Sequence, residues 1–357
     1  MAEGGIHQVL EMAMPGDAIF NLALAIRDWV RARGFQSEIL SHHIAPGALQ
    51  EARPFWRPWA IRPQDLLLYH FGLSGEATGF VKARQAAGAR VILYYHNVTP
   101  PEFYKNEDPV LHSRLLRSRE ELGELAKIAP LALTDSNYNA SDLYQAGFKQ
   151  VAVAAPVLLD ERWKVPPDPR VLAAYRDGKV NLLFVGRITP SKRQEDLIKI
   201  LYYCQRLEPN MRLLLVGHWG TTQAYYGWLQ DLTRYLGLKE VVFSGHVSQA
   251  EVNAYYQVAD VFVSMSEHEG FGVPLVESMY MGVPVIAYDS AAVAETIGEA
   301  GILIKNKDFP VIAELIHLLL QDKALRGRLI ENQKRRAETY SIEAVREKFW
   351  ESLSLLR

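Results

Sequence analysis

Two glutamates stand eight positions apart in the stretch EHEGFGVPLVE, Glu269 and Glu277, with Gly270 and Gly272 between them. Glycine lets backbone amides approach a ligand closely, and Pro274 suits the first turn of a helix. Glu269 then lies on a loop and Glu277 on a helix. The two carboxylates could hold two ends of one elongated ligand, with a diphosphate between them at the helix N-terminus. Acids that complement a helix dipole would explain Glu277, but neither Glu269 nor the glycines.

Two cations follow another apolar run, in the stretch VGRITPSKR. Gly186 permits a tight turn, and Arg187 and Lys192 are five positions apart across the start of the next helical pattern. A guanidinium and an ammonium beside helix amides make a suitable phosphate site. Two solvated charges on a loop are the alternative, and these residues alone do not decide between the two.

The first half of the chain offers fewer such residues. His96 and Asn97 follow the apolar run RVILYY, and Gly16 stands between another apolar run and a helical pattern. A histidine in a turn before a proline-containing loop explains His96 equally well. A single glycine such as Gly16 is weak evidence for a ligand that approaches the backbone.

The elements that position these residues are clearest in the second half. Short apolar runs alternate there with helical patterns, and strands that are apolar on both faces indicate a parallel sheet covered on both sides. The runs occupy 180–186, 211–217, 240–245, 261–266, 284–289 and 301–304. This alternation predicts a doubly wound, Rossmann-like domain, which binds ligands at the carboxyl ends of its strands.

The first half repeats the pattern less regularly, with strands predicted at 7–14, 37–40, 64–70, 90–96, 131–136 and 150–156. We therefore expect an α/β protein of two doubly wound domains, 1–160 and 161–340, that face each other across a cleft. The proline-rich and charged stretch 161–170 is interpreted as the linker. A last amphipathic helix, 341–357, is expected to cross back to the first domain.

Composition excludes several classes of protein. The formal net charge of −2 argues against a dedicated nucleic-acid binder, which usually carries a basic excess. A single cysteine, Cys204, excludes an internal disulfide framework and suits a reducing compartment. No run reaches 18 apolar residues, so no membrane-spanning helix is expected. The Gly-x-Gly-x-x-Gly pattern of dinucleotide dehydrogenases follows none of the predicted strands.

The motifs together resemble the retaining glycosyltransferases of family 4, which have the GT-B fold. The matching pieces are FVGRITPSK, LLLVG, the long stretch from FSGHVSQAEV to GVPVIAYD, GILI and the early PGDAIFNLALAI. The resemblance covers nearly all of the second domain and is patchier in the first. The two glutamates, with seven residues between them, match the paired-glutamate motif of that family.

The resemblance implies a role for each matching residue. Gly186, Arg187 and Lys192 would bind the donor diphosphate, and Glu277 would bind the ribose hydroxyls. Residues along the loop would contact the donor sugar: Glu269, Gly270, Phe271, Gly272 and Val273. Val247 would meet the base through its backbone, His96 would contact the sugar from the first domain, and Gly16 would face the phosphates or the acceptor.

The implied reaction moves a hexose from a UDP- or GDP-sugar to an acceptor hydroxyl with retention of anomeric configuration. Arg187 and Lys192 would take part in the chemistry by neutralising the leaving diphosphate. Glu269 and His96 would take part through their contacts with the donor sugar. The sequence holds no Asp-x-Asp motif, so we expect neither a cofactor nor an essential metal. Glu269 could act as a nucleophile, or a donor phosphate oxygen could take the proton of the acceptor. The resemblance favours the second route.

Two other functions remain compatible with these residues, a nucleotide-sugar epimerase and a non-catalytic nucleotide-sugar-binding protein. The acceptor is expected to be a glycan or a lipid-linked glycan in bacterial polysaccharide or glycolipid assembly, in the cytoplasm. Aromatic and basic stretches at 53–63 and 112–127 could rest on the inner face of the membrane. An aromatic core edge and a solvated helix face explain the same stretches.

Overall fold

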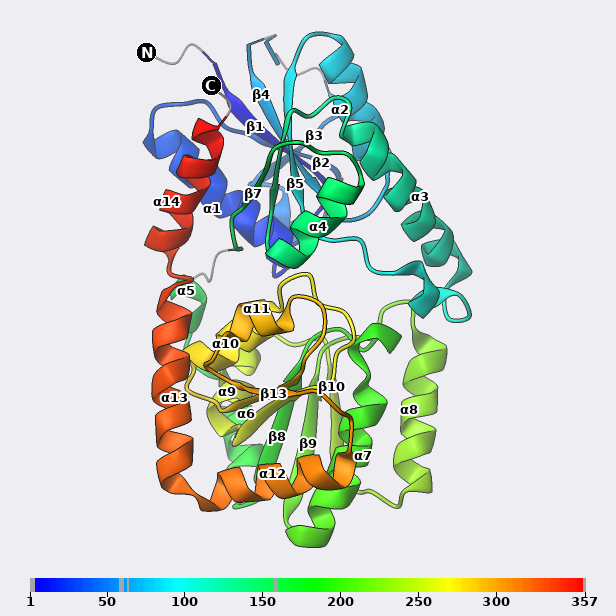
Figure 1. Ribbon diagram of the computed structural model, residues 1–357, viewed down its shortest axis with the longest axis vertical. Coiled ribbons are helices and arrows are strands. Elements are labelled where there is room, and N and C mark those ends of the chain that lie inside the picture. The colour runs from blue at the N-terminus through cyan, green and yellow to red at the C-terminus, as the bar shows by residue number, and fades with distance from the viewer. Residues whose placement is uncertain (1–3, 58–60, 63, 157–159, 356–357) are drawn as a thin grey trace. The chain divides into compact units, whose positions relative to one another are not determined.

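The chain folds into two compact units in the computed structural model, which describes residues 4–57, 61 and 62, 64–156 and 160–355 (Figure 1). The first unit comprises Met1–Glu102, Val110–Val157 and Ser341–Arg357, and the second comprises Phe103–Pro109 and Leu158–Tyr340. The prediction of an α/β protein with two doubly wound sheets is confirmed.

The first unit is built on a parallel sheet whose described strands run in the order β3-β2-β1-β4-β5-β6-β7. The strands are β1 (Ile6–Ala13), β2 (Ile39–Ile44), β3 (Ala52–Pro54), β4 (Leu66–Phe71), β5 (Arg90–Tyr95), β6 (Leu131–Thr134) and β7 (Val151–Val153). The helices are α1 (Ala18–Ala32), α2 (Glu76–Ala86), α3 (Pro109–Leu125), α4 (Asn137–Gln145) and α14 (Ile342–Ser354). The order reverses between β1 and β4, which is where open α/β sheets bind ligands.

The turn from β1 into α1 is set by Asp17. Its carboxylate accepts hydrogen bonds from the backbone of Ile19, at 2.9 Å, and of Phe20, at 3.1 Å, so it caps the helix. Gly16, directly before this cap, has a φ of +84°. The space beside its Cα is open.

Helix α14 belongs to the first unit, although it comes last in the chain. Figure 1 shows it beside α1. The rings of Trp29 and Phe349 lie 5.8 Å apart, and the Arg33 guanidinium lies 4.0 Å from the ring centre of Trp350. Phe349 is 1% exposed, so α14 covers an apolar face that α1 would otherwise present to water.

The second unit is built on a parallel sheet with the order β10-β9-β8-β11-β12-β13 among the described strands. The strands are β8 (Val180–Val185), β9 (Met211–Val216), β10 (Val241–Gly245), β11 (Val261–Ser264), β12 (Val285–Tyr288) and β13 (Ile302–Ile304). The helices are α5 (Asp160–Trp163), α6 (Pro169–Tyr175), α7 (Gln194–Leu207), α8 (Gln223–Tyr235), α9 (Gln249–Val258), α10 (Val273–Tyr280), α11 (Val293–Ile297), α12 (Phe309–Gln321) and α13 (Lys323–Glu338).

The stretch 161–170, interpreted above as a linker, is largely folded against the second unit. The Asn253 side chain donates hydrogen bonds to the backbone carbonyls of Arg162, at 2.9 Å, and Val165, at 2.8 Å. The Asp168 backbone donates to the Ala250 carbonyl at 2.9 Å. The structure thus assigns this stretch to the second unit. Proline and charge indicated a loop but not what the loop contacts.

Residues 103–109 also join the second unit, which the sequence did not predict. The Glu107 carboxylate accepts a hydrogen bond of 3.0 Å from the backbone of Tyr225, in the first turn of α8. A carboxylate is favoured at that position because the first amides of a helix lack partners within it. A short segment from the first half of the sequence therefore caps a helix of the second unit.

Candidate active site

The predicted residues of the second unit come from loops at one edge of its sheet. Strands β9, β8 and β11 are neighbours and parallel, so the loops that follow them leave the same edge. The loop after β8 carries Arg187 and Lys192, and the loop after β11 carries Glu269. Strand pairing thus places these three residues at a common edge.

The turn that carries Arg187 is shaped by two glycines. A Cβ on Gly217 would lie 2.0 Å from the carbonyl oxygen of Gly186, so only glycine fits there, and its φ is +149°. The Gly186 backbone donates to the Val216 carbonyl at 2.9 Å, and Ile188 donates to His218 at 3.0 Å. Strand-like pairing therefore continues past both strands and fixes the backbone of Arg187.

The Arg187 side chain is exposed, and its guanidinium forms no ion pair with any residue in the described part of the chain. Partial burial lowers the pKa of His218, and the charges of Arg187 and His246 lower it further. His218 is therefore neutral at neutral pH, and the positive charge at this edge comes from Arg187. An exposed, uncompensated guanidinium is suited to bind a phosphate.

Lys192 and Glu269 are in direct contact, although their loops are far apart in the sequence. The Lys192 ammonium lies 2.7 Å from the Glu269 carboxylate and donates to the His268 carbonyl at 3.1 Å. Only 19% of the Lys192 side chain and 15% of the Glu269 side chain are exposed. The pair is thus shielded from bulk water, which strengthens its attraction.

The loop between Glu269 and α10 is held at several backbone atoms. Gly272, at the start of the helix, has a φ of +91°, and a Cβ there would lie 2.7 Å from Leu275. The Phe271 carbonyl accepts a hydrogen bond of 2.6 Å from the Thr296 hydroxyl. Gly270 precedes this anchored pair, and Val273 opens the helix. Of the two glycines, Gly272 is thus the one whose backbone conformation requires glycine.

Glu277 is buried on α10 and bound through both oxygens. Its Oε2 accepts a hydrogen bond of 2.9 Å from the Tyr256 hydroxyl, and its Oε1 lies 3.1 Å from the Arg162 guanidinium. Burial raises the pKa of Tyr256 well above its usual value, and the nearby Glu277 raises it further, so the hydroxyl stays a donor. Each carboxylate oxygen has a second lone pair, which could accept a ligand hydroxyl.

Sequence reasoning did not identify Arg162 or Tyr256. Arg162 lies in the stretch interpreted as a linker, and Tyr256 in a helical pattern with two adjacent tyrosines. A buried glutamate needs a partner, but nothing in the sequence says which residue supplies it.

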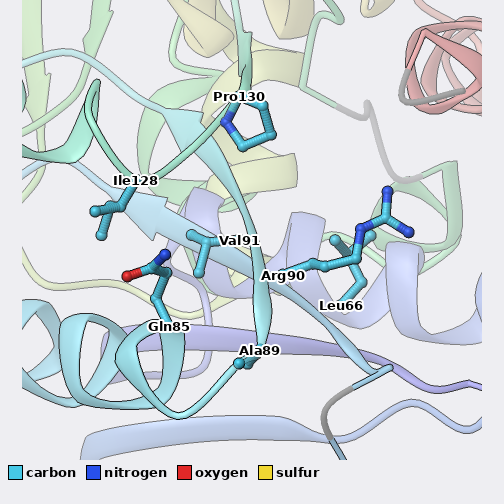
Figure 2. A pocket seen from close by; sticks show the side chains of 8 residues that line it. Leu66, Gln85, Ala89, Arg90, Val91, Ile128 and Pro130 are labelled. Atoms are coloured by element: carbon cyan, nitrogen blue, oxygen red, sulfur yellow. The ribbon is translucent and has the colours of Figure 1, made fainter.

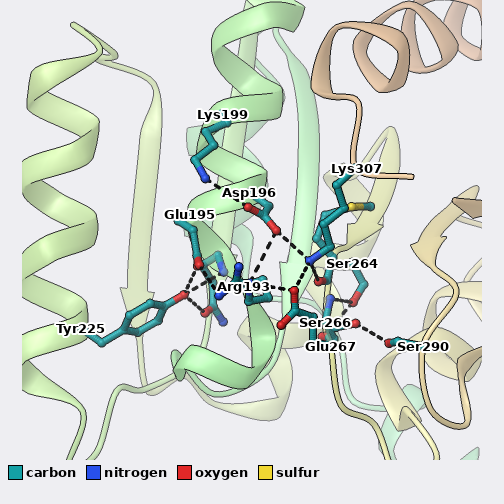
Figure 3. A network of polar contacts seen from close by, with 12 residues as sticks. Arg193, Glu195, Asp196, Lys199, Tyr225, Ser264, Ser266, Glu267, Ser290 and Lys307 are labelled. Carbon is teal, nitrogen blue, oxygen red and sulfur yellow. Dashed lines mark hydrogen bonds and ion pairs between the residues drawn. The ribbon is translucent and has the colours of Figure 1, made fainter. Parts of the chain in front are cut away.

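A second ionic network involves close sequence neighbours of the predicted residues (Figure 3). Lys307 donates to Asp196 at 2.8 Å and to Glu267 at 2.9 Å, and so ties helix α7 to the loop after β11. Arg193 lies 3.2 Å from the same Glu267 and has a left-handed backbone, with a φ of +54°. These contacts join the two loops that carry Lys192 and Glu269, one residue and two residues away.

Val247 lies at the start of another helix of this edge. It is half-buried and precedes Ser248, whose hydroxyl and backbone form a reciprocal cap with Glu251 at the start of α9. The backbone of Val247 is therefore held in place by the helix that follows. Among the described residues, no hydrogen bond or ion pair joins it to Glu277 or Glu269.

The first unit carries His96 at the carboxyl end of β5, with both ring nitrogens engaged. Its Nδ1 lies 3.0 Å from the Asp135 carboxylate, and its Nε2 lies 2.9 Å from Nδ1 of His70. Only 5% of the His96 side chain is exposed. A direct hydrogen bond from His96 to a sugar would require one of these contacts to break. Asp135 is the last residue but one of the predicted strand 131–136, and that position near the strand end was the signal that could have identified it.

Other hollows and clusters lie elsewhere in the first unit. A cavity of about 290 Å³, lined by Leu66, Gln85, Arg90 and Ile128 among others, lies at the amino ends of β4 and β5, opposite His96 (Figure 2). In the stretch 53–63, Phe55 is buried and Trp56 is 63% exposed, while Trp59 lies outside the described residues. Within the described chain, the His/Cys/Asp/Glu group close enough to share a cation is Glu11, His42 and His43.

The described helices include none that is both long and apolar enough to cross a bilayer.

Comparison with known proteins identifies the second unit. Residues 172–336 match the sequence profile of the family "Glycosyl transferases group 1". These residues form a group 1 glycosyltransferase domain. The domain contains every predicted site residue of the second unit, from Gly186 to Glu277, whereas Arg162 lies outside it. The resemblance inferred from the motifs is thus confirmed, and the placement in family 4 is consistent with this match.

Some relatives align with this chain well beyond the glycosyltransferase domain. The O-antigen chain mannosyltransferase B of Escherichia coli is 25% identical over 287 residues, which are 76% of this chain and 70% of the relative. The D-inositol 3-phosphate glycosyltransferase of Streptomyces bingchenggensis is 31% identical over 293 residues, 77% of this chain and 63% of the relative. The second alignment thus spans less than two thirds of that protein.

Solved structures extend the fold to the whole chain. The Anabaena protein HepE, crystallised in complex with UDP and glucose, has a TM-score of 0.78 at 18% identity, over 98% of this chain and 99% of its own. At this identity the likeness shows the fold alone. With the two parallel-sheet units, it gives the glycosyltransferase the GT-B architecture predicted from the sequence.

Proposed function

We propose that this glycosyltransferase moves a hexose from a UDP- or GDP-sugar to a hydroxyl of a glycan or lipid-linked glycan, with retention of anomeric configuration. The observation that carries the proposal is the contact between Lys192 and Glu269, on the loop that leads into α10 through the left-handed Gly272. An ammonium and a carboxylate meet there, close in the sequence to the start of a helix, where backbone amides attract anions. A sugar joined to a diphosphate presents hydroxyls and anionic oxygens to these groups.

Each end of the donor has a group that suits it. The exposed Arg187 and the Lys192 ammonium would bind the diphosphate, and the buried Glu277 would accept from the ribose hydroxyls. Glu269 would accept from hydroxyls of the sugar, and the backbone before α9, at Val247, would meet the base. The complex of HepE with UDP and glucose supports a nucleotide-sugar donor, and the mannosyltransferase of Escherichia coli supports a hexose.

The chemical step is a displacement at the anomeric carbon. The bond from that carbon to the diphosphate oxygen breaks, the bond to the acceptor oxygen forms on the same face, and a donor phosphate oxygen takes the acceptor proton. Negative charge grows on the diphosphate as it leaves, and Arg187 and Lys192 stabilise it. No step of this sequence requires a metal ion.

The contact with Lys192 favours Glu269 as a binding residue over a nucleophile. An ammonium 2.7 Å from the carboxylate stabilises its negative charge, which makes the carboxylate a poorer nucleophile. The proposal therefore assigns Glu269 to the sugar hydroxyls.

The test supplies the purified chain with UDP- and GDP-hexoses, with and without a glycan-lipid extract. Nucleotide release that depends on acceptor, with a product whose anomeric proton coupling matches that of the donor, is the expected result. Inverted product would contradict retention. Epimerised donor in the absence of acceptor would instead favour an epimerase, and tight nucleotide binding with neither product would favour a non-catalytic binder. The proposal places the reaction in the cytoplasm, where vesicle co-sedimentation would test contact with the membrane.

A further inference from the structure

A chain of hydrogen-bonded polar side chains crosses the first sheet from β1 to the end of β6. Gln8 comes from β1, His70 from β4, His96 from the residue after β5, and Asp135 from the residue after β6. These four strands are consecutive neighbours in the sheet. Gln8 is 0% exposed, His70 4% and Asp135 7%, so water does not compete for these bonds. The donor and the acceptor of each hydrogen bond in this series can therefore be assigned in turn.

The first link fixes the orientation of Gln8. Its amide nitrogen lies 2.7 Å from the backbone carbonyl of Ala23, on α1. A carbonyl only accepts hydrogen bonds, so the amide NH₂ must face it, and the amide oxygen must face the other way. That oxygen lies 2.9 Å from Nε2 of His70. Nε2 of His70 therefore carries a proton and donates it to Gln8.

The second link fixes the tautomer of His70. Burial lowers the pKa of His70 well below its usual value, and the charge of His96 lowers it further, so the ring is neutral. A neutral imidazole carries one proton, and here Nε2 has it. The other nitrogen, Nδ1, is thus an acceptor. It lies 2.9 Å from Nε2 of His96, which must donate to it.

The last link lies between His96 and Asp135. Nδ1 of His96 is 3.0 Å from the Asp135 carboxylate, which accepts. We infer that His96 is held as an imidazolium, with one N–H bound to His70, the other bound to Asp135, and Asp135 as its buried counter-ion. Tyr94 stacks on the ring at 4.5 Å and adds no charge, because its hydroxyl donates to the Ala154 carbonyl at 2.5 Å.

This inference changes the role of His96 and rests, for that role, on the proposed function. A ring with both N–H groups engaged is a fixed positive charge, and it neither takes a proton nor offers a free donor. It lies at the carboxyl edge of the first sheet, where such sheets bind ligands. Gln8, His70 and Asp135 are then positioning residues that set the charge of His96 and do not touch the substrate.

The protonation state can be measured without any activity. Nitrogen-15 NMR of histidine-labelled full-length protein near neutral pH distinguishes a ring with two N–H groups from a ring with one. The His96 signals are assigned by their loss in His96→Asn, and the exposed His246 in the second unit serves as reference. Two N–H groups on His96 in the wild type are expected. A bare nitrogen on His96 would overturn the inference, even if the protein proves to be a glycosyltransferase.

Gln8→Leu tests whether the relay sets this state from two links away. Without the amide oxygen, His70 can place its proton on Nδ1 and donate to His96, which then keeps only the N–H that faces Asp135. Asp135→Asn removes the counter-ion, and His96 should then keep only the N–H that faces His70. Leu10→Ala, in the same strand and 1% exposed, is the matched control for lost stability and should leave the His96 signals unchanged. An unchanged two-proton pattern in both relay variants would refute the positioning role.

If the proposed function is right, kcat depends on the positive charge of His96. His96→Asn should lower kcat roughly a hundredfold, with a smaller change in donor KM, because a fixed charge acts most on the charge that develops in the transition state. Gln8→Leu should lower kcat while it also changes the NMR signature. Normal kcat in a variant whose His96 has lost a proton would show that the charge is not used. Absence of transferase activity in the wild type would refute the proposed function and leave the NMR result standing.

Discussion

The Lys192 ammonium and the Glu269 carboxylate lie 2.7 Å apart in the unliganded chain, and both are mostly shielded from water. The charges of the two residues therefore cancel locally before a donor arrives. Arg187, exposed and without an ion-pair partner among the described residues, supplies the uncompensated positive charge at the same edge. A diphosphate that binds there would meet Arg187 directly and would compete with Glu269 for Lys192.

Removing either cation should therefore slow the reaction. We expect Lys192→Ala and Arg187→Ala each to lower kcat about a hundredfold, because each loses one charge-assisted contact to the leaving group. Steady-state kinetics with the preferred donor would measure this, with circular dichroism to verify folding. Lys239→Ala, an exposed lysine after α8, is the control and should retain activity. Near-normal turnover in both cation variants would place the phosphate site elsewhere.

The ion pair predicts that substitutions of Lys192 and of Glu269 have non-additive effects on donor affinity. Lys192→Ala leaves the mostly buried Glu269 carboxylate without its partner, which costs more than the contact itself. Adding Glu269→Gln should then restore part of the donor affinity that Lys192→Ala loses, by about tenfold. Isothermal titration with the nucleoside diphosphate completes the double-mutant cycle. Strictly additive losses would mean that the pair does not act as a unit in solution.

Metal removal should leave the activity intact. Arg187, Lys192 and the amides at the start of α10 are the groups that we assign to the diphosphate, so no divalent ion is required. The measurement is the initial rate before and after dialysis against excess EDTA. Loss of activity that manganese restores would refute the metal-free assignment.

Substitutions of the two glutamates of the motif should affect different steps, nucleotide binding for Glu277 and turnover for Glu269. Glu277→Ala should mainly weaken binding of the nucleotide, because ribose contacts persist from the ground state to the transition state. Glu269→Ala should lower kcat more than it weakens binding of UDP or GDP. Glu299→Ala, on an exposed loop, is the control. Equal losses of nucleotide affinity with unchanged turnover would contradict the assignment of the two glutamates to opposite ends of the donor.

Arg162 should matter for nucleotide binding although it lies outside the matched domain. Its guanidinium lies 3.1 Å from Glu277 and orients that buried carboxylate. We expect Arg162→Ala to weaken nucleoside diphosphate binding about tenfold, the effect of losing one charged hydrogen bond. Arg170→Ala, on the same segment but paired only with Asp168 among the described residues, should bind normally. Equal nucleoside diphosphate affinities in the two variants would show that Arg162 does not contribute to nucleotide binding.

Much of this architecture was readable because buried parallel strands are apolar on both faces. Strands β8 to β13 begin and end within two residues of the runs predicted for them. Strand β3 (Ala52–Pro54) was missed, since three residues give no pattern. Residues at strand ends were found where their chemistry stood out, as for Arg187 and Glu269. That Lys192 contacts Glu269 is a tertiary fact, which no spacing along the chain encodes.

The relay in the first sheet was missed for a related reason. Gln8 lies inside a predicted strand and His70 is the last residue of another, and a polar residue in a strand is usually a satisfied core side chain. Only the register of neighbouring strands reveals that His70 lies between Gln8 and His96. Sequence reasoning therefore identified His96 at its strand end, and not the three residues that set its protonation, Gln8, His70 and Asp135.

Helix α14 gives the chain an order of events during its synthesis. The face of α1 that holds Trp29 is covered by Phe349, so some three hundred residues separate the two halves of one packed layer. A ribosome releases the partner of α1 only after the whole second unit has been made. Until then the apolar face of α1 that holds Trp29 stays exposed to water, which makes the incomplete chain prone to aggregation.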